Sequence, residues 1–338
     1  MKNYVTLLLN WFLENRRELP WRKDINPYHV WISEVMLQQT KIDKVIHYYN
    51  NFIQEIPDIK SLSEISDDKL LKLWEGLGYY SRARNLKKAA IMIMNNFHGE
   101  FPDNYDSILS LPGIGEYTAG AIASICFQLP EVSVDGNTMR VFCRLYNLDL
   151  DISSLQARKT IASKLRNILP EKSGDFNQAI MELGETICLP NGIPKCSKCP
   201  LCYCCQAHVN QNETLIPRKS TRGEKLEEEY TIFLLKCKNK YALHKRQTNL
   251  LKNMWEFPNE TGFFTYDEIK EKFKDSVYIE MGPTNTHIFS HQKWFMNSYF
   301  IEVKKKIDGY VWATIEEINL NYAIPTAFMP FFDYIKTK

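Results

Sequence analysis

The sequence contains no long hydrophobic run. No apolar stretch reaches the roughly 18 continuous residues that a membrane-spanning helix needs, so we expect no membrane partner. The opening stretch MKNYVTLLLNWFLENRR carries a glutamate and a tryptophan and lacks a small-residue cleavage site. We therefore interpret it as an amphipathic helix and not as a signal peptide, and we expect a cytoplasmic protein.

The chain also lacks an excess of charge of either sign. It has 42 Lys and Arg residues against 40 Asp and Glu residues, a formal net charge of +2, and the balance is similar on both sides of residue 205. A nucleic-acid-binding domain often shows a strong basic excess. Bulk charge therefore gives no support for a nucleic-acid partner, and any such case depends on local sites.

Length and composition indicate a globular protein with two domains. A chain of 338 residues is long for one core, and 44% apolar with 24% charged residues is an ordinary globular composition. Up to about residue 187 apolar residues recur at helical spacing, and no internal repeat is visible. Helix starts are predicted at Asn26-Pro27, Ser66-Asp67 and Ser81.

The character of the sequence changes after Cys205. Residues 206–228 are polar with little periodicity, and we predict an interdomain linker there. From Tyr230 on, the strand-like runs YTIFLLKCKNKYALHKR, DSVYIEMGP, NSYFIEVKKK and GYVWATIEE accompany two helical stretches, TYDEIKEKF and IPTAFMPFFDYI. The predicted fold is a mostly α-helical region over residues 1–205 followed by a smaller α/β domain over residues 229–338.

Two stretches place polar groups where they could act chemically. In NPYHVWISEVMLQQT, Glu34 interrupts an apolar helix, and a buried carboxylate is costly unless it is paired or protonated. In LPGIGEYTAGAI, Gly113 and Gly115 allow a tight turn whose backbone N–H groups, at a helix N-terminus, could hold a phosphate. Taken alone, the second pattern could equally be a simple helix–helix turn. Asp135 in VSVDGNTMRVFCRL precedes another helix, where an Asp usually serves as a cap.

The nine cysteines are unevenly distributed. Six of them lie within residues 188–205, and the other three are scattered in apolar surroundings. A secreted disulfide framework would spread its cysteines and use an even number, so the dense group favours a metal site in a reducing compartment. Four thiolates separated by 7, 2 and 5 residues could ligate an iron–sulfur cluster or zinc: Cys188, Cys196, Cys199 and Cys205.

In their order along the chain, these motifs resemble those of the MutY-type adenine DNA glycosylases. The matching set is SEVMLQQT, GLGYYSRARNL, LPGIGEYTAGAI, VDGNTMRV, the cysteine loop, MWEFP and FSHQKW, and it covers nearly the whole chain. The resemblance implies a helix-hairpin-helix glycosylase with a six-helix barrel over about residues 21–130. It also implies an iron–sulfur module from residues 1–20 and 131–205 and a Nudix-like domain that recognises the lesion over residues 229–338.

The resemblance implies a monomeric base-excision-repair enzyme with one [4Fe-4S] cluster. It would flip out and hydrolytically remove adenine mispaired with 8-oxoguanine or guanine in double-stranded DNA. Glu34 matches the general acid that protonates adenine, and Asp135 matches the carboxylate that stabilises the sugar cation. Tyr117 and Asn137 match residues that orient these carboxylates. Because related endonuclease III enzymes carry an attacking Lys where this chain has Tyr117, a monofunctional glycosylase is expected.

Further positions match DNA-binding residues of that family. Gln39 and Tyr79 match residues that fill or wedge the vacated base stack, and Arg22 and Gln178 match positions near the adenine pocket. The loop that senses 8-oxoguanine corresponds to Phe289, Ser290 and His291. The C-terminal domain lacks a Nudix box, so it should recognise and not hydrolyse.

The cysteine loop departs from the family pattern. The usual first gap is six residues and here it is seven, with the extra residue expected to bulge near Gly192. The four cysteines named above are the implied ligands, but Cys202 and Cys204 leave an alternative ligand set open. The cluster would order a loop whose Lys195 and Lys198 face phosphate.

Two alternative functions remain open on the sequence. One is an endonuclease III-like bifunctional glycosylase and lyase, which Tyr117 and the FSH-bearing domain argue against. The other is a non-catalytic iron–sulfur module that only binds DNA, which the presence of both Glu34 and Asp135 argues against.

Overall fold

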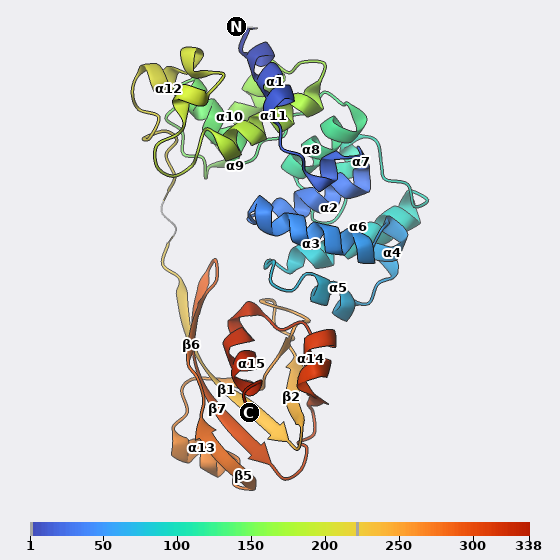
Figure 1. Ribbon diagram of the computed structural model, residues 1–338, viewed down its shortest axis with the longest axis vertical. Helices are drawn as coiled ribbons and strands as arrows, with labels where there is room; N and C mark the ends of the chain where they lie inside the picture. The colour runs from blue at the N-terminus through green and yellow to red at the C-terminus, as the bar shows by residue number, and fades with distance from the viewer. Residues whose placement is uncertain (1–2, 221–222) are drawn as a thin grey trace. The chain divides into compact units, whose positions relative to one another are not determined.

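The structure is a computed structural model that describes residues 3–220 and 223–338. By their contacts, residues 3–64 and 85–220 form a first compact unit, and residues 65–84 and 223–338 form a second. Figure 1 shows that the first unit is helical and that the second contains a sheet. The predicted order of a helical region followed by an α/β domain is confirmed.

The first unit consists of helices joined by short loops. These are α1 (Asn3–Asn15), η1 (Pro20–Arg22), α2 (Pro27–Leu37), α3 (Ile42–Glu55), α4 (Ile59–Glu64), α7 (Tyr105–Leu109), α8 (Glu116–Phe127), α9 (Gly136–Leu145), α10 (Leu155–Arg166), α11 (Ser173–Thr186), η2 (Cys196–Lys198), η3 (Cys202–Cys204) and α12 (Gln206–Val209). Helix α6 (Ser81–Asn96) begins in the second unit and ends in the first. No helix in the described ranges is long and apolar enough to span a bilayer.

The three predicted helix starts are confirmed, two of them with side-chain caps. The side chain of Asn26 accepts from the backbone N–H of Tyr28, and Pro27 occupies the first helical position, where its missing N–H costs nothing. The side chain of Ser66 accepts from the Lys69 N–H at the start of α5 (Asp67–Leu73). Helix α6 begins at Ser81.

Helix α11 is the central element of the first unit. It packs against α1, α8 and α9, and buried Phe12, Phe142 and Phe176 fill the core between them. Its first turn lies directly on the end of α8, because a Cβ atom on Gly174 would stand 2.5 Å from the carbonyl oxygen of Ser124. This close approach brings residues of α8, α9 and α11 to one cavity.

The second unit is built on a sheet of eight strands. These are β1 (Leu226–Cys237), β2 (Lys240–Lys245), β3 (Trp255–Glu256), β4 (Asn259–Thr261), β5 (Ser276–Met281), β6 (Asn285–Ile288), β7 (Gln292–Val303) and β8 (Val311–Ala313). Strands β1 and β7 pair in parallel from Leu226↔Gln292 to Lys236↔Glu302, and β5 and β6 pair antiparallel with β7.

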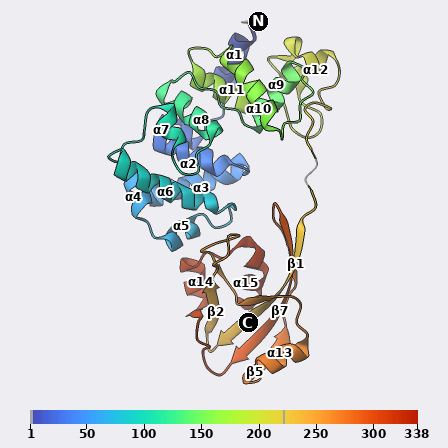
Figure 2. The same ribbon diagram turned by 180° about the vertical axis from the view of Figure 1, so that it is seen from behind.

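Apolar side chains alternate between the two faces of β1. Ile232 and Leu234 join one core with residues of α14 (Ile315–Asn321), η4 (Thr326–Phe328) and α15 (Met329–Ile335), whereas Phe233 and Leu235 join another with α13 (Tyr266–Lys272). The two views agree, since α14 and α15 lie on one side of the sheet and α13 on the other (Figures 1 and 2). Strand β1 begins four residues before the predicted strand, because its acidic start pairs with β7.

Candidate active site

A cavity of about 200 Å³ in the first unit gathers polar side chains from four elements. Glu34 comes from α2, Tyr117 from α8, Asp135 from the residue before α9, and Gln178 from α11. These residues lie far apart in sequence. The close packing of α8, α9 and α11 brings them around one space.

Glu34 is a buried carboxyl group with one hydrogen-bond donor. Its exposed fraction is 6%, and the phenol Oη of Tyr117 donates to its Oε2 over 2.5 Å. Burial raises the pKa of Glu34 to about 7, because the loss of water contact outweighs the hydrogen bond from Tyr117, which lowers the pKa. Asp135 raises the pKa further, and Arg22 lowers it. A carboxyl group with this pKa holds its proton for part of the time at neutral pH. The pKa of Tyr117 is raised well above its ordinary value, also by burial, so its hydroxyl remains a donor.

The side chain of Asp135 is held in place by a backbone donor and a side-chain donor. It caps α9: its Oδ1 accepts from the Thr138 N–H over 2.7 Å, and its Oδ2 accepts from Nδ2 of Asn137 over 2.8 Å. Asn137 is oriented in turn by Arg140, whose Nη2 donates to Oδ1 over 2.8 Å. Both oxygens of Asp135 are therefore fixed in position at the N-terminus of α9.

A network of charged groups forms another wall of the cavity. Arg22 donates from Nε to Oε1 of Gln178 over 3.1 Å and from Nη2 to Oε2 of Glu182 over 2.9 Å. Glu182 is 1% exposed and also pairs with Arg17 over 2.5 Å. The sequence analysis missed Arg17 and Glu182. Glu182 could have been predicted, because it is a carboxylate one helical turn after Gln178 on the buried face of α11.

The two hairpin glycines have different roles in the structure. Gly113 has a φ of +82°, and a Cβ atom there would lie 2.6 Å from Cβ of Asn85, so only glycine fits. Gly115 caps α8 in an extended conformation, and no atom lies within 4 Å of the place where its Cβ would be. The backbone is therefore open to a ligand at the start of α8.

The residues predicted to fill the base stack lie in turns with positive φ. Gln39 is exposed with a φ of 59° just after α2, in the first unit. Tyr79 is 44% exposed with a φ of 48° just before α6, in the second unit. Both values lie in the left-handed region, where non-glycine residues are uncommon and worth a functional explanation.

A second cavity, of about 710 Å³, lies within the second unit. Phe289, Ser290 and His291 form the turn between β6 and β7 and line this cavity together with Tyr79. The hydroxyl groups of Tyr79 and Ser290 lie 3.0 Å apart, within hydrogen-bond distance. The turn is closed by the Phe289 N–H, which donates to the carbonyl of Gln292 over 2.8 Å.

The four predicted ligand cysteines interact with one another electrostatically. Burial raises the pKa of the Cys199 thiol to about 12, and the nearby Cys188, Cys205 and Cys196 add to this rise. Two donors point at sulfur, since the Leu201 N–H lies 3.4 Å from Sγ of Cys199 and the Nη1 of Arg144 lies 3.2 Å from Sγ of Cys188. Such donors suit thiolate ligands.

The other two cysteines of the loop, Cys202 and Cys204, have other contacts. Cys204 donates from Sγ to the carbonyl of Leu201 over 3.2 Å, and its thiol interacts with that of Cys202. Cys202 also interacts with Cys196.

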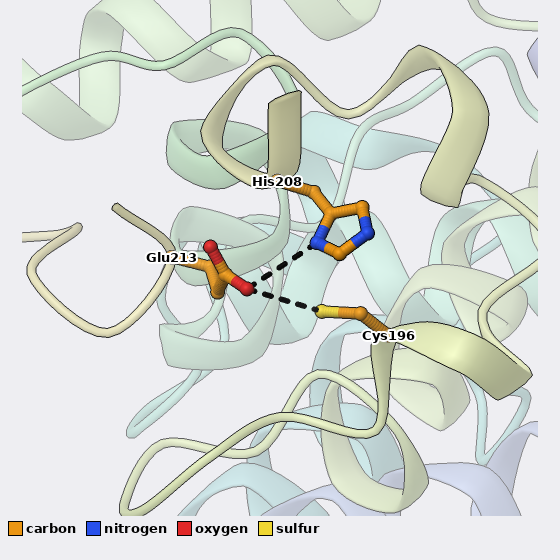
Figure 3. A group of neighbouring side chains, drawn as sticks. All are labelled: Cys196, His208 and Glu213. Atoms are coloured by element: carbon orange, nitrogen blue, oxygen red, sulfur yellow. Dashed lines mark hydrogen bonds and ion pairs between the residues drawn. The ribbon is translucent and has the colours of Figure 1, made fainter. Parts of the chain in front are cut away.

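One further group of potential metal ligands surrounds Cys196. Figure 3 shows the side chains of Cys196, His208 and Glu213 as neighbours. Sγ of Cys196 lies 4.0 Å from Oε1 of Glu213, and the same oxygen lies 3.3 Å from Nδ1 of His208. The ligand atoms of these three residues all lie within 4.8 Å of one another. The sequence analysis missed His208 and Glu213, because neither belongs to a recognisable ligand spacing.

Comparisons with known proteins place both units. Residues 32–167 match the HhH-GPD superfamily of base excision DNA repair proteins, and residues 231–334 match the NUDIX domain, which confirms the predicted fold class. An adenine DNA glycosylase of Buchnera aphidicola subsp. Baizongia pistaciae (strain Bp) is 40% identical over 255 residues, which are 74% of this chain and 72% of the relative.

Two more relatives extend the comparison. An adenine DNA glycosylase of Buchnera aphidicola subsp. Schizaphis graminum (strain Sg) is 36% identical over 290 residues, covering 85% of this chain and 82% of the relative. The solved structure of a thermostable thymine-DNA glycosylase matches with a TM-score of 0.57 at 28% identity, covering 62% of this chain and 96% of that one.

Proposed function

Because the chain belongs to the adenine DNA glycosylase family, we propose that it removes adenine mispaired with 8-oxoguanine or guanine from double-stranded DNA, acting as a monomer. The observation that carries the proposal is the pair Glu34 and Asp135, which line one cavity, with the pKa of Glu34 raised to about 7. Cleavage of an N-glycosidic bond requires one group that gives a proton to the departing base and another that faces the charge developing on the sugar.

Glu34 acts as the general acid. Adenine is a poor leaving group as an anion, so the bond breaks more easily when a proton is delivered to the base as it departs. The buried carboxyl group keeps a proton near pH 7. Tyr117 holds the acceptor oxygen Oε2, which leaves Oε1 for the base.

Asp135 stabilises the positive charge that develops on the sugar. Its carboxylate is fixed by Asn137 and Thr138, so it does not need to reorganise as the charge forms. Arg22 and Gln178 form the wall that would contact the flipped adenine.

Tyr117 also limits the reaction to base removal. A lyase of this superfamily needs an amine at this place to form a Schiff base with the sugar, and a phenol cannot form one. The enzyme is therefore a monofunctional glycosylase, and the bifunctional alternative is set aside.

Cys188, Cys196, Cys199 and Cys205 would hold one [4Fe-4S] cluster. The residues fit such a group, because these thiols interact with one another and receive hydrogen bonds from Arg144 and Leu201. When bound, the cluster supplies a cross-link that orders the loop. That loop presents Lys195 and Lys198 for contact with DNA phosphates.

The second unit recognises 8-oxoguanine. Ser290 and His291 offer hydrogen-bonding groups at the cavity, and Tyr79 can stack against a base at the same place. Gln39 would fill the space that the flipped adenine leaves, and Gly113 and Gly115 would let the backbone approach a phosphate.

A substrate survey under single-turnover conditions tests this proposal. Matched duplexes carrying A opposite 8-oxoguanine, guanine or thymine, and T opposite guanine, are incubated with excess enzyme, and the released base and any nicked strand are identified. We expect free adenine from the first two duplexes, with 8-oxoguanine preferred, and no enzyme-dependent nick. Release of thymine, or strand cleavage that keeps pace with base release, would overturn it.

A further inference from the structure

The cavity of the second unit has walls from separate segments of the chain. One wall is the loop over residues 249–251, a second is the turn over residues 287–292, and a third is the segment over residues 78–81. Guanine and 8-oxoguanine differ only at the edge of the base. A cavity can tell them apart only if its walls are held to within a fraction of an ångström.

Arg246 lies buried directly behind two of these walls. Its exposed fraction is 8%, and its Nη1 donates to both carboxylate oxygens of Glu256, over 3.1 and 3.0 Å. Glu256 is 1% exposed. Removing two charges from water costs several kcal/mol, so a buried pair is weak evidence for a role in stability and calls for another explanation.

Arg246 holds the loop that forms the first wall. Its Nε donates to the carbonyl of Leu250 over 2.9 Å. Two backbone hydrogen bonds close the loop: the Arg246 N–H donates to the carbonyl of Met254, and the Asn253 N–H donates to the carbonyl of Arg246, both over 2.9 Å. Leu251 and Asn253 have φ values of 61° and 66°. A left-handed conformation is strained for leucine, so this loop keeps its shape only because its surroundings hold it.

The same guanidinium group supports the second wall. Its carbon lies 4.8 Å from the ring centroid of Trp294, which is 1% exposed. The Trp294 ring in turn contacts Phe289 edge to face, with 4.7 Å between centroids. Phe289 begins the turn that carries Ser290 and His291.

We infer that Arg246 is a positioning residue that sets the preference for 8-oxoguanine over guanine. It bonds Leu250 on one side of the cavity and, through Trp294, supports Phe289 on the other, so it fixes the separation of the two walls. Glu256 orients the guanidinium for both contacts. This inference rests on the proposed function, because it assigns the cavity to the base opposite adenine.

Arg246→Lys is the informative substitution. Lysine keeps the positive charge beside Glu256, but an ammonium group cannot also bond Leu250 and cover the ring of Trp294. Because a broken buried pair could unfold the domain, a double variant, Arg246→Met with Glu256→Leu, removes both charges together. Arg158→Lys, on the exposed face of α10, is the matched control.

The measurement is the single-turnover rate of adenine release from A:8-oxoguanine and A:guanine duplexes, made with the full chain. We expect both Arg246 variants to lower the ratio of the two rates about fivefold or more, while the A:guanine rate stays within about twofold of the parent. The control should keep the parent ratio.

Three results would separate the possible failures. An unchanged ratio in folded Arg246→Lys and in the double variant would overturn the inference. An equal fall of both rates would also overturn it, because that is the effect of a merely structural residue. If the parent itself shows no preference for 8-oxoguanine, the proposed lesion recognition fails, and this inference fails with it.

Discussion

Glu34 shows how burial gives one residue its chemistry. Its apolar neighbours on α2 are already visible in the sequence, and this pattern was enough to predict an unusual carboxyl group at that position. The structure adds the cause and the direction of the pKa shift, because burial raises the pKa of Glu34 more than the hydrogen bond from Tyr117 lowers it, and Asp135 adds to the rise. The position of Glu182 one helical turn after Gln178 is a local pattern, but its pairing with Arg17 is not. That pairing joins α11 to the chain after α1, and no local pattern reveals it.

The proposed acid makes the reaction depend on pH. With a pKa of about 7, Glu34 loses its proton as the pH rises through neutrality, so the single-turnover rate should fall above about pH 7. The rate should approach a tenfold loss per pH unit well above that value. A rate that stays flat from pH 6 to pH 9 would contradict the role of Glu34.

Tyr117→Phe provides a directional control for this pH profile. The Tyr117 hydroxyl lowers the pKa of Glu34, so its removal should move the fall in rate to higher pH, even if the maximum rate changes. Tyr105→Phe, on α7, should leave the profile where it is. A shift to lower pH would show that the hydrogen bond is wrongly assigned.

Glu34 should also reduce stability at alkaline pH. Its folded-state pKa of about 7 lies above the ordinary value of 4.5, so the folded chain binds the proton more tightly than the unfolded chain does. Stability should then fall as the pH rises from about 4.5 to 7, and the ionised group should cost up to ~3 kcal/mol above that range.

Glu34→Gln tests this cost by equilibrium unfolding. The variant should be more stable than the parent at pH 8, and the difference should shrink towards zero below about pH 4.5. Glu14→Gln, at an exposed position on α1, should show no such trend. Equal stability of parent and Glu34→Gln at pH 8 would mean that the carboxyl group ionises without penalty.

At the scale of elements, the packing of α8, α9 and α11 assembles the site. The close backbone contact between α8 and α11 sets how near these two helices lie. The helix starts at Asn26 and Ser66 could be predicted because capping is local. The early start of β1 at Leu226 could not, because it depends on pairing with β7, more than 60 residues later. The contact between α8 and α11 is also invisible in sequence, since a glycine there reads as a weak helix former.

Gly174→Ala should therefore destabilise the protein although alanine favours helices. The new Cβ atom would stand 2.5 Å from the Ser124 carbonyl oxygen and 2.8 Å from Cα of Ile125, so α11 would have to move. We expect a loss of about 1–3 kcal/mol in the free energy of unfolding, measured with urea. Gly136→Ala, where no atom lies within 4 Å, should be neutral or stabilising. A stabilised Gly174→Ala variant would contradict the close contact.

At the scale of the whole molecule, family resemblance and structure supply different information. The order of the motifs predicted the helical fold and the Nudix-like domain, and the family matches confirm both. Sequence spacing left the cysteine ligands open, because six thiols lie within residues 188–205. In the structure, Cys199 interacts with three of the other loop cysteines, whereas Cys204 bonds within its own turn.

Two cysteine substitutions test this ligand set. Cys199→Ser should lose most of its iron and visible absorbance, whereas Cys204→Ser should keep both, because the thiols that interact with Cys199 are those of Cys188, Cys196 and Cys205. The measurement is the iron and sulfide content of each purified variant. Loss of iron in Cys204→Ser as large as that in Cys199→Ser would favour the alternative ligand set.

The division of labour between the two carboxyl groups is tested most directly by single-turnover adenine release from an A:8-oxoguanine duplex. The parent is compared with Glu34→Gln and Asp135→Asn, with binding of the same duplex measured in parallel. We predict that each variant binds the duplex about as tightly as the parent but releases adenine at least about a hundredfold more slowly. Adenine release at the parent rate by either variant would contradict the account.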